Sequence, residues 1–407
     1  MRNGTPGFQG LRLVEAREAR QLTQTALAEL IGRKSSTVSR WESGAQSPEP
    51  DALQKLAEKV ELPVSFFMRP LADHGSAGIY ARSQASTTQM ARKRARARLR
   101  WTQDISLALQ EWVDLPPVNF PDLKATDCRE IRDEEIERKA VECRRHWGLG
   151  NAPISDLLCV IENAGGVVVQ DRVDSSKLDG LSQWSCADQR PYVLIASDKA
   201  TCVRSRFDAA HELGHVVLHK HLSAEAQRDS ASFKEIERQA FLFAGAFLLP
   251  SEGFASELWS PSLNSFLALK ERWKVSIAAM IMRCSTLEIV RDEYEKRLWK
   301  SYSARGWRNH EPLDEQLPLE KTRLLPRSVR LLLDEGARSR QDLLEDFRLA
   351  AHDVEALCGL PEGFMIRDHV DAEVVQLPRL KTSNVKERVT EQPGKVLSFP
   401  PRPVERS

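Results

Sequence analysis

The segment His211-Glu212-Leu213-Gly214-His215 contains the pattern H-E-x-x-H and lies just past the middle of the chain. On an α-helix, residues four apart lie on one face, so the imidazoles of His211 and His215 can bind a single Zn²⁺. That arrangement leaves room for a third ligand and a water, toward which Glu212 can act as general base. The alternative is a buried helix whose histidines make only core hydrogen bonds.

A third protein ligand is expected on a neighbouring helix. A straight helix separates His211 from His219 by roughly 12 Å, too far for both to bind one ion through bonds of about 2 Å. His219 is therefore expected at the helix end or near substrate. The apolar positions of residues 233–249 define a buried helix face, and Glu237 belongs to it. A carboxylate there is costly unless paired or metal-bound, so Glu237 is the predicted third ligand, with a surface salt bridge as the alternative.

Residues before and within the H-E-x-x-H segment predict how its helix begins and packs. Ser205 and Asp208 fit the spacing of a capping box. Asp208 precedes His211 by about one turn, so it could instead orient that imidazole through a hydrogen bond. Gly214 lowers helix stability, which indicates that another element packs closely against it.

Residues on both helices together resemble the ImmA/IrrE family of zinc metallopeptidases. The residues that carry the resemblance are Arg206-Phe207-Asp208-Ala209-Ala210, the H-E-x-x-H segment, Glu237-Arg238-Gln239-Ala240, Phe243-Ala244 and Leu248-Leu249-Pro250. The resemblance implies that His211, His215 and Glu237 bind zinc and that Glu212 is the catalytic base. It also implies limited cleavage of a transcriptional repressor. This chain departs from the family at Phe241, where many members carry Asn or Asp.

Residues 8–70 predict a bundle of short helices with a helix-turn-helix. A second helix near residues 23–31 ends at Gly32, and a third covers residues 36–43. If Val38 and Trp41 face inward, the exposed side chains of the third helix can meet DNA in the major groove. The predicted DNA-contacting residues are Gln24, Ser36, Thr37, Ser39 and Arg40.

The same stretch resembles the XRE (Cro/C1-type) helix-turn-helix family through Thr23-Gln24, Leu27-Ala28 and the segment from Val38 to Gly44. It departs at Gln21, where many members carry glycine. A helical bundle used for protein contact is the alternative. Cro-type domains often bind DNA as dimers, so a homodimer is expected.

The distribution of charge and the cysteines indicate a partner and a cellular compartment. The net charge of +1 hides a basic N-terminal part, because residues 1–110 carry 17 Lys and Arg against 10 Asp and Glu. This asymmetry favours nucleic-acid contact at one end of the chain. The seven cysteines form no C-x-x-C pair, which favours reduced core thiols in a cytoplasmic protein. No basic and apolar leader and no membrane span are expected.

The predicted fold class is mainly α, with a small α+β zincin-like metallopeptidase domain and an N-terminal all-α helix-turn-helix bundle. Expected parts are the bundle at 8–70, a basic or charged helical linker at 71–150 and the peptidase at 151–260. A helical extension at 261–312, a small helical module at 318–372 and a disordered tail at 377–407 follow. Within the linker, the basic run at 91–100 is expected to be a solvated connector, with phosphate contact as the alternative.

Three strands are expected before the H-E-x-x-H helix, at 167–169, 181–184 and 192–195. The strand just ahead of that helix can offer an open edge to an extended peptide, and an ordinary covered edge is the alternative.

Two functions fit these observations. The first is a DNA-binding zinc metalloendopeptidase that cuts a helix-turn-helix repressor. The second is a helix-turn-helix regulator, antitoxin-like in one version, whose zinc domain senses a ligand or partner without proteolysis. The intact H-E-x-x-H favours the enzyme, because a sensor needs the two histidines but not Glu212. Three residues are candidates for stabilising the oxyanion, namely His219, Tyr192 and Tyr294.

Overall fold

The N-terminal part is the predicted all-α bundle. The computed structural model describes residues 4–75, the backbone of 80–83, and residues 89–175, 178–198, 201–223, 225–226 and 229–366. The bundle consists of α1 (Gly10–Ala19), α2 (Gln24–Ile31), α3 (Ser35–Glu42), α4 (Pro50–Lys59) and the 3₁₀ helix η1 (Val64–Met68). Gly32 ends α2 in the left-handed region at φ 69°. Gln21 also has a positive φ, 54°, which explains why glycine suits that position.

Four strands form one sheet, in the order β1-β3-β4-β2. They are β1 (Tyr80–Ser83), β2 (Val167–Asp171), β3 (Leu178–Trp184) and β4 (Pro191–Ala196). β2 is parallel to β4, whereas β3 is antiparallel to both β1 and β4. The last three correspond to the predicted strands, and β1 was not predicted. The open-edge expectation for the strand just ahead of the H-E-x-x-H helix is wrong, because β4 lies between β3 and β2.

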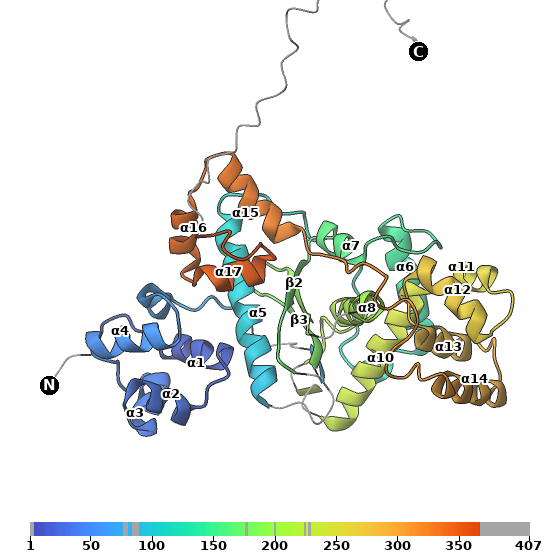
Figure 1. Cartoon of the computed structure of the whole chain (residues 1–407), viewed down its shortest axis with the longest axis horizontal. Coiled ribbons are helices and arrows are strands. Elements are labelled where there is room, and N and C mark those ends of the chain that lie inside the picture. Colours follow the sequence, from blue (N-terminus) through green and yellow to red (C-terminus); the bar gives the residue numbers. More distant parts are fainter. Residues whose placement is uncertain are drawn as a thin grey trace, which may run out of the picture. The chain divides into compact units, whose positions relative to one another are not determined.

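Each face of the sheet supports a separate hydrophobic core, as side chains alternate along the strands. Val167, Val169 and Leu194 belong to the core shared with α5 (Gln89–Gln110) and the N-terminal bundle. Val168 and Val193 belong to the core shared with α8 (Cys202–Leu218) and α10 (Ser230–Leu248). Figure 1 shows α5 on one side of the sheet and α8 on the other.

The basic run at 91–100 is not a solvated connector, and this expectation was wrong. It forms the first half of α5, in which Ala95, Ala97 and Leu99 are buried. Arg98 is buried as well and pairs with Asp171 of β2 at 2.6 Å. The spacing of the alanines gives this helix an apolar face. The number of basic residues suggested exposure to solvent, so this face was not predicted.

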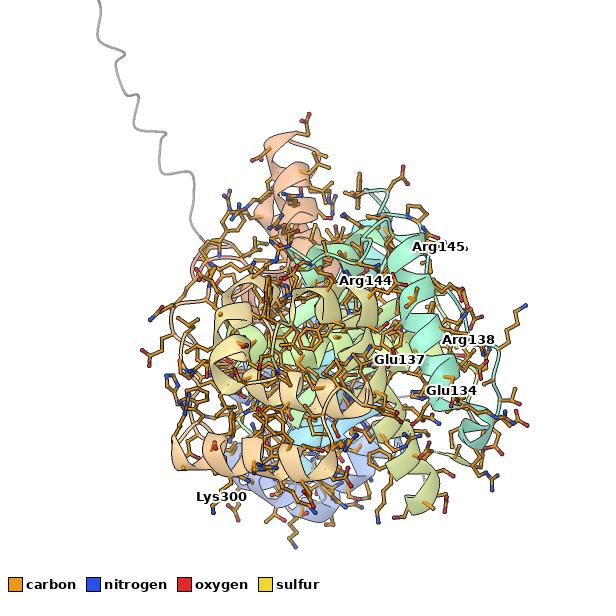
Figure 2. The ribbon with its side chains drawn as sticks, turned by 90° about the vertical axis from the view of Figure 1, so that its right-hand side faces the viewer. Glu134, Glu137, Arg138, Arg144, Arg145 and Lys300 are labelled. Atoms are coloured by element: carbon orange, nitrogen blue, oxygen red, sulfur yellow. The ribbon has the colours of Figure 1, made fainter. Side chains whose placement is uncertain are left out.

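Helices on the α8 side complete the second core. They are η2 (Cys128–Glu130), α6 (Asp133–His146), α7 (Leu157–Asn163), α11 (Ser251–Glu257), α12 (Leu263–Trp273), α13 (Ile277–Thr286) and α14 (Asp292–Ala304). Charged side chains such as Glu134, Arg138 and Arg145 follow the length of α6 (Figure 2). Arg144 on the same helix is buried and donates to the carbonyl of Phe247 at 2.5 Å, which ties α6 to the end of α10.

The C-terminal module consists of α15 (Leu324–Asp334), α16 (Arg340–Phe347) and α17 (Ala351–Cys358), which pack on α5 and β2 as part of the first core. The tail expected at 377–407 lies outside the described residues. In the part of the chain that is described, no helix has the length and apolar character needed to cross a membrane.

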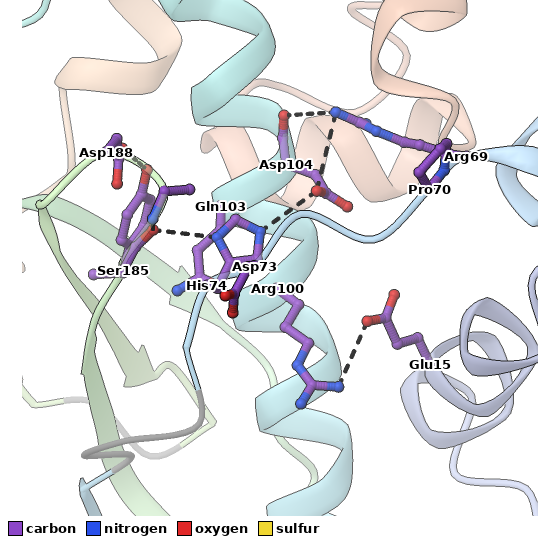
Figure 3. Close-up of polar contacts among 12 residues, drawn as sticks. Glu15, Arg69, Pro70, Asp73, His74, Arg100, Gln103, Asp104, Ser185 and Asp188 are labelled. Atoms are coloured by element: carbon purple, nitrogen blue, oxygen red, sulfur yellow. Dashed lines mark hydrogen bonds and ion pairs between the residues drawn. The ribbon is translucent and has the colours of Figure 1, made fainter.

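Buried ion pairs hold the N-terminal bundle against α5. Arg12 of α1 contacts Asp104 of α5 at 2.6 Å, and both side chains are almost fully buried. Arg69 and His74 also reach Asp104, at 4.0 and 3.6 Å (Figure 3). The His74 ring lies 3.2 Å from the hydroxyl of Ser185. The segment that leaves the bundle is therefore fixed to both α5 and the end of β3.

Candidate metal centre

The helix that carries H-E-x-x-H begins earlier than expected. Thr201 caps α8 by accepting from the amide of Arg204. The predicted capping box of Ser205 and Asp208 is therefore wrong, because they are the fourth and seventh residues of the helix. Asp208 is buried and lies 3.9 Å from Arg204, one turn back along α8.

The close packing expected at Gly214 is present. A β-carbon at this position would lie 3.1 Å from the α-carbon and the carbonyl oxygen of Ala240 on α10. The backbones of α8 and α10 therefore meet here, between the two histidines of α8 and beside Glu237 of α10.

The structure brings His211, His215 and Glu237 together. The Nε2 atoms of the two histidines are 3.1 Å apart. Glu237 places Oε2 3.3 Å from His211 Nε2 and Oε1 3.5 Å from His215 Nε2. Among the residues that the structure describes, these form the one group of three or more His, Cys, Asp or Glu residues with ligand atoms gathered for a metal ion.

These separations fit a zinc ion. Bonds of about 2.0–2.1 Å at the tetrahedral angle place neighbouring ligand atoms about 3.3–3.4 Å apart. The three observed separations, 3.1, 3.3 and 3.5 Å, lie on either side of that value. Two imidazoles and one carboxylate are also a ligand set that zinc accepts, with a fourth position left for water or substrate.

A relay of hydrogen bonds fixes the proton on His215. Gln239 Nε2 donates to the carbonyls of Cys128 and Ile131, at 2.7 and 3.3 Å, so Gln239 Oε1 must face His219 Nε2 at 3.0 Å. His219 then carries its proton on Nε2 and accepts at Nδ1 from His215 Nδ1, 3.0 Å away. The lone pair of His215 is thereby left on Nε2, which faces His211 and Glu237.

Burial keeps His219 neutral. Burial lowers the pKa of His219 well below its usual value, and the neighbouring His215 lowers it further. His219 is the C-terminal cap of α8, as its predicted place at the helix end requires, and it is fully buried. It lies behind a metal-facing imidazole rather than at a surface that substrate could touch.

Glu237 is held as a carboxylate. Burial by itself raises the pKa of Glu237, but the adjacent imidazoles of His211 and His215 outweigh burial and bring that pKa far below its usual range. Glu235, two residues earlier, points away from the two histidines. It pairs with Arg238 at 2.6 Å and accepts a hydrogen bond from Gln239 Nε2 at 3.0 Å. The helical spacing therefore separated the inward glutamate from the outward one correctly.

Glu212 lies between α8 and β3. Its Oε2 accepts a hydrogen bond of 2.6 Å from the hydroxyl of Ser182. Gly180, two residues earlier on the same face of β3, leaves space for the carboxylate, because a β-carbon there would lie 2.6 Å from Glu212 Oε1. The backbone of β3 and one hydroxyl thus position the expected general base.

A cleft of about 740 Å³ opens beside the site. Phe207 of α8 and Phe241 of α10 line it, with ring centroids 4.9 Å apart. Asp208 also lines the cleft. Phe241 therefore supplies an aromatic wall where the resemblance led us to expect a polar side chain.

The remaining candidates lie elsewhere. The Tyr192 hydroxyl donates to Asp188 at 2.6 Å, and Tyr294 is exposed on α14. His221, exposed past the end of α8, pairs with Asp122 at 2.8 Å. Sequence reasoning missed Gln239, Ser182 and Gly180. Of these only Gly180 left a signal, since a glycine inside a strand often marks a close approach.

On α3, Val38 and Trp41 are buried as expected, and Ser36, Ser39 and Arg40 are exposed. Thr37 is half-buried. Gln24 is also half-buried and donates to Glu42 at 2.6 Å, so its amide is already engaged within the bundle.

Comparison with known families agrees with both resemblances. Residues 161–285 match the model of the peptidase family M78, described as an IrrE N-terminal-like domain. Residues 13–67 match a helix-turn-helix family. No curated protein matches the chain. The chain thus carries an N-terminal helix-turn-helix domain and an IrrE-like peptidase domain, a combination that supports a regulator with a peptidase-like domain.

Proposed function

We propose that the chain is a zinc-dependent endopeptidase whose helix-turn-helix domain binds DNA and whose peptidase domain cuts a helix-turn-helix repressor. The observation that carries the proposal is the convergence of His211, His215 and Glu237 at zinc-like separations, with Glu212 on the adjoining turn. A site that only sensed a metal would need the ligands but not a positioned carboxylate beside them.

The side chains have distinct roles in this proposal. His211, His215 and Glu237 would hold the ion, which when bound supplies Lewis acidity for polarising a peptide carbonyl and acidifying a water. Glu212 accepts the proton of the attacking water and passes it to the amine that leaves as the peptide bond breaks. Ser182 orients Glu212 through its 2.6 Å hydrogen bond. Gln239 and His219 keep the lone pair of His215 on the ligand-facing nitrogen.

The repressor assignment rests on the pairing of the two domains. A helix-turn-helix domain on the same chain would bring the peptidase to DNA, where a repressor is bound. The exposed residues Ser36, Ser39 and Arg40 of α3 would supply the DNA contacts. Thr37 and Gln24 would support the same surface.

The test is to incubate the purified, zinc-loaded chain with the helix-turn-helix repressor encoded nearest to it. Specific fragments should appear, and a chelator should abolish them. Glu212→Gln should lower the rate by at least about 100-fold, the usual contribution of a general base, without loss of zinc. Glu271→Gln, a change at an exposed residue of α12, is the matched control and should cut normally.

Zinc bound at one equivalent, sequence-specific DNA binding and no fragments with any repressor tested would contradict proteolysis. That result would favour a DNA-binding sensor instead.

A further inference from the structure

The strand β1 lies beside the proposed catalytic base. It pairs antiparallel with β3, with Tyr80 opposite Ser182 and Arg82 opposite Gly180. Ser182 donates to Glu212, and Gly180 leaves space for its carboxylate. β1 also contacts α8. The backbone of these four residues therefore runs along the edge of β3 at the level of the site.

The proposed general base is covered in this arrangement. Glu212 and His215 are 0% exposed and His211 is 2% exposed, whereas the side chain of Glu237 is 21% exposed. A peptide cannot place a scissile carbonyl beside Glu212 unless something that covers this carboxylate moves. β1 is the outermost strand of the described sheet and consists of only four residues, so it can leave without breaking the pairing of β3 with β4.

The described residues that flank β1 in the sequence are held by the rest of the chain. On its N-terminal side, the carbonyl of His74 accepts from the amide of Cys186 at 3.3 Å and from Gln183 at 3.3 Å. On its C-terminal side, α5 is anchored in the core. The pairing also has an irregular register between Arg82 and Ser83, where the ladder is locally disrupted.

We infer that β1 occupies the strand position on β3 that an extended substrate peptide takes, so that the chain carries its own competitor for the site. The inference rests on the proposed function. It restricts substrates to segments that can add as an antiparallel strand, such as an exposed loop or an unfolded stretch, because main-chain pairing is the recognition that this edge offers. A segment that is folded as a helix or as a paired strand cannot be a substrate under this inference.

A tethered segment competes at an effective concentration on the order of millimolar. A free copy of this segment that binds the vacated edge with a dissociation constant of about 10–100 μM should therefore bind the intact chain about 10- to 100-fold more weakly.

The test measures binding of a fluorescent peptide spanning residues 79–86, by anisotropy, to the full chain carrying Glu212→Gln so that nothing is cut. One variant changes Tyr80, Ala81 and Arg82 to glycine, which weakens strand formation. The control changes Ser86, Thr87 and Thr88 to glycine, in the same connection but outside β1. Ala81→Pro is a second variant, because proline removes a backbone donor. Circular dichroism identifies the variants that fold.

Binding at least ten times tighter in the β1 variants, and unchanged in the control, supports the inference. Equal binding in all folded proteins, or equal tightening in the control, overturns it. Hydrolysis of the same peptide by the proteins with Glu212 intact is measured separately. Tighter binding without zinc-dependent cleavage refutes the proposed peptidase and leaves the inference on β1 standing.

Discussion

Replacing Gln239 with methionine tests whether the buried relay sets the metal affinity. Gln239 touches no metal ligand directly, yet it fixes the proton of His219 and through it that of His215. Methionine has a similar length and fills the fully buried space, but it removes the acceptor for His219 Nε2. The His215 ring then loses its fixed tautomer and orientation.

Two effects of this substitution can be separated. Loss of a partner behind a ligating histidine weakens metal binding by about 10- to 100-fold, which corresponds to about 1.4–2.8 kcal/mol. The carbonyls of Cys128 and Ile131 also lose their donor, and each unsatisfied buried group costs about 1–3 kcal/mol of folding free energy. The stability loss should appear in the metal-free protein as well, whereas the affinity loss is specific to the site.

The assay is a zinc titration against a chromophoric chelator, together with thermal unfolding of the metal-free protein. Gln103→Met is the matched control, because Gln103 is equally buried but bonds to Gln183, on the opposite face of the sheet from Glu212. Gln239→Met should lower the zinc affinity at least tenfold and Gln103→Met should not. A zinc affinity within twofold of the unaltered chain, in a folded Gln239→Met protein, would refute the relay.

Three further predictions concern other parts of the chain. Gly180→Ala places a β-carbon 2.6 Å from the carboxylate of the proposed general base. It should lower peptidase activity at least tenfold while zinc still binds. Gly245→Ala is the control, because nothing lies within 4 Å of the added carbon, and it should leave the rate unchanged. Asp104→Asn removes the charge that Arg12, Arg69 and His74 surround. It should lower the free energy of unfolding, measured by denaturant titration, by about 3–5 kcal/mol. A loss under 1 kcal/mol would contradict the role of this ion cluster as an anchor. Arg40→Ala should weaken DNA binding by about 1–3 kcal/mol in gel shifts at fixed salt, and unaltered binding would remove α3 as the contacting helix.

Local patterns predicted which side chains meet, where spacing alone determines position. The i, i+4 histidines and the inward side of α10 follow from helical geometry, so Glu237 could be distinguished from Glu235. The bundle at the N-terminus followed from its apolar periodicity and its glycine stop. These inferences needed no knowledge of how distant segments meet.

Long-range packing was the part that the sequence did not reveal. The run of arginines in α5 suggested exposure to solvent, but Arg98 is buried against Asp171 of β2, which lies 73 residues later in the chain. Four residues of β1 carry too little pattern to predict a strand, and their partner strand lies about a hundred residues later. Ser182 and Gln239 matter through contacts across elements, for which no periodicity exists.

The contact between α8 and α10 at Gly214 has a consequence for the spacing of the three candidate ligands. Two of them lie on α8 and one on α10, so the approach of the two helices determines how near the carboxylate stands to the imidazoles. A side chain at Gly214 would meet the backbone of Ala240 at 3.1 Å and would move α10, and Glu237 with it, away from the histidines. A residue that offers no ligand atom thus sets the distance between those that do.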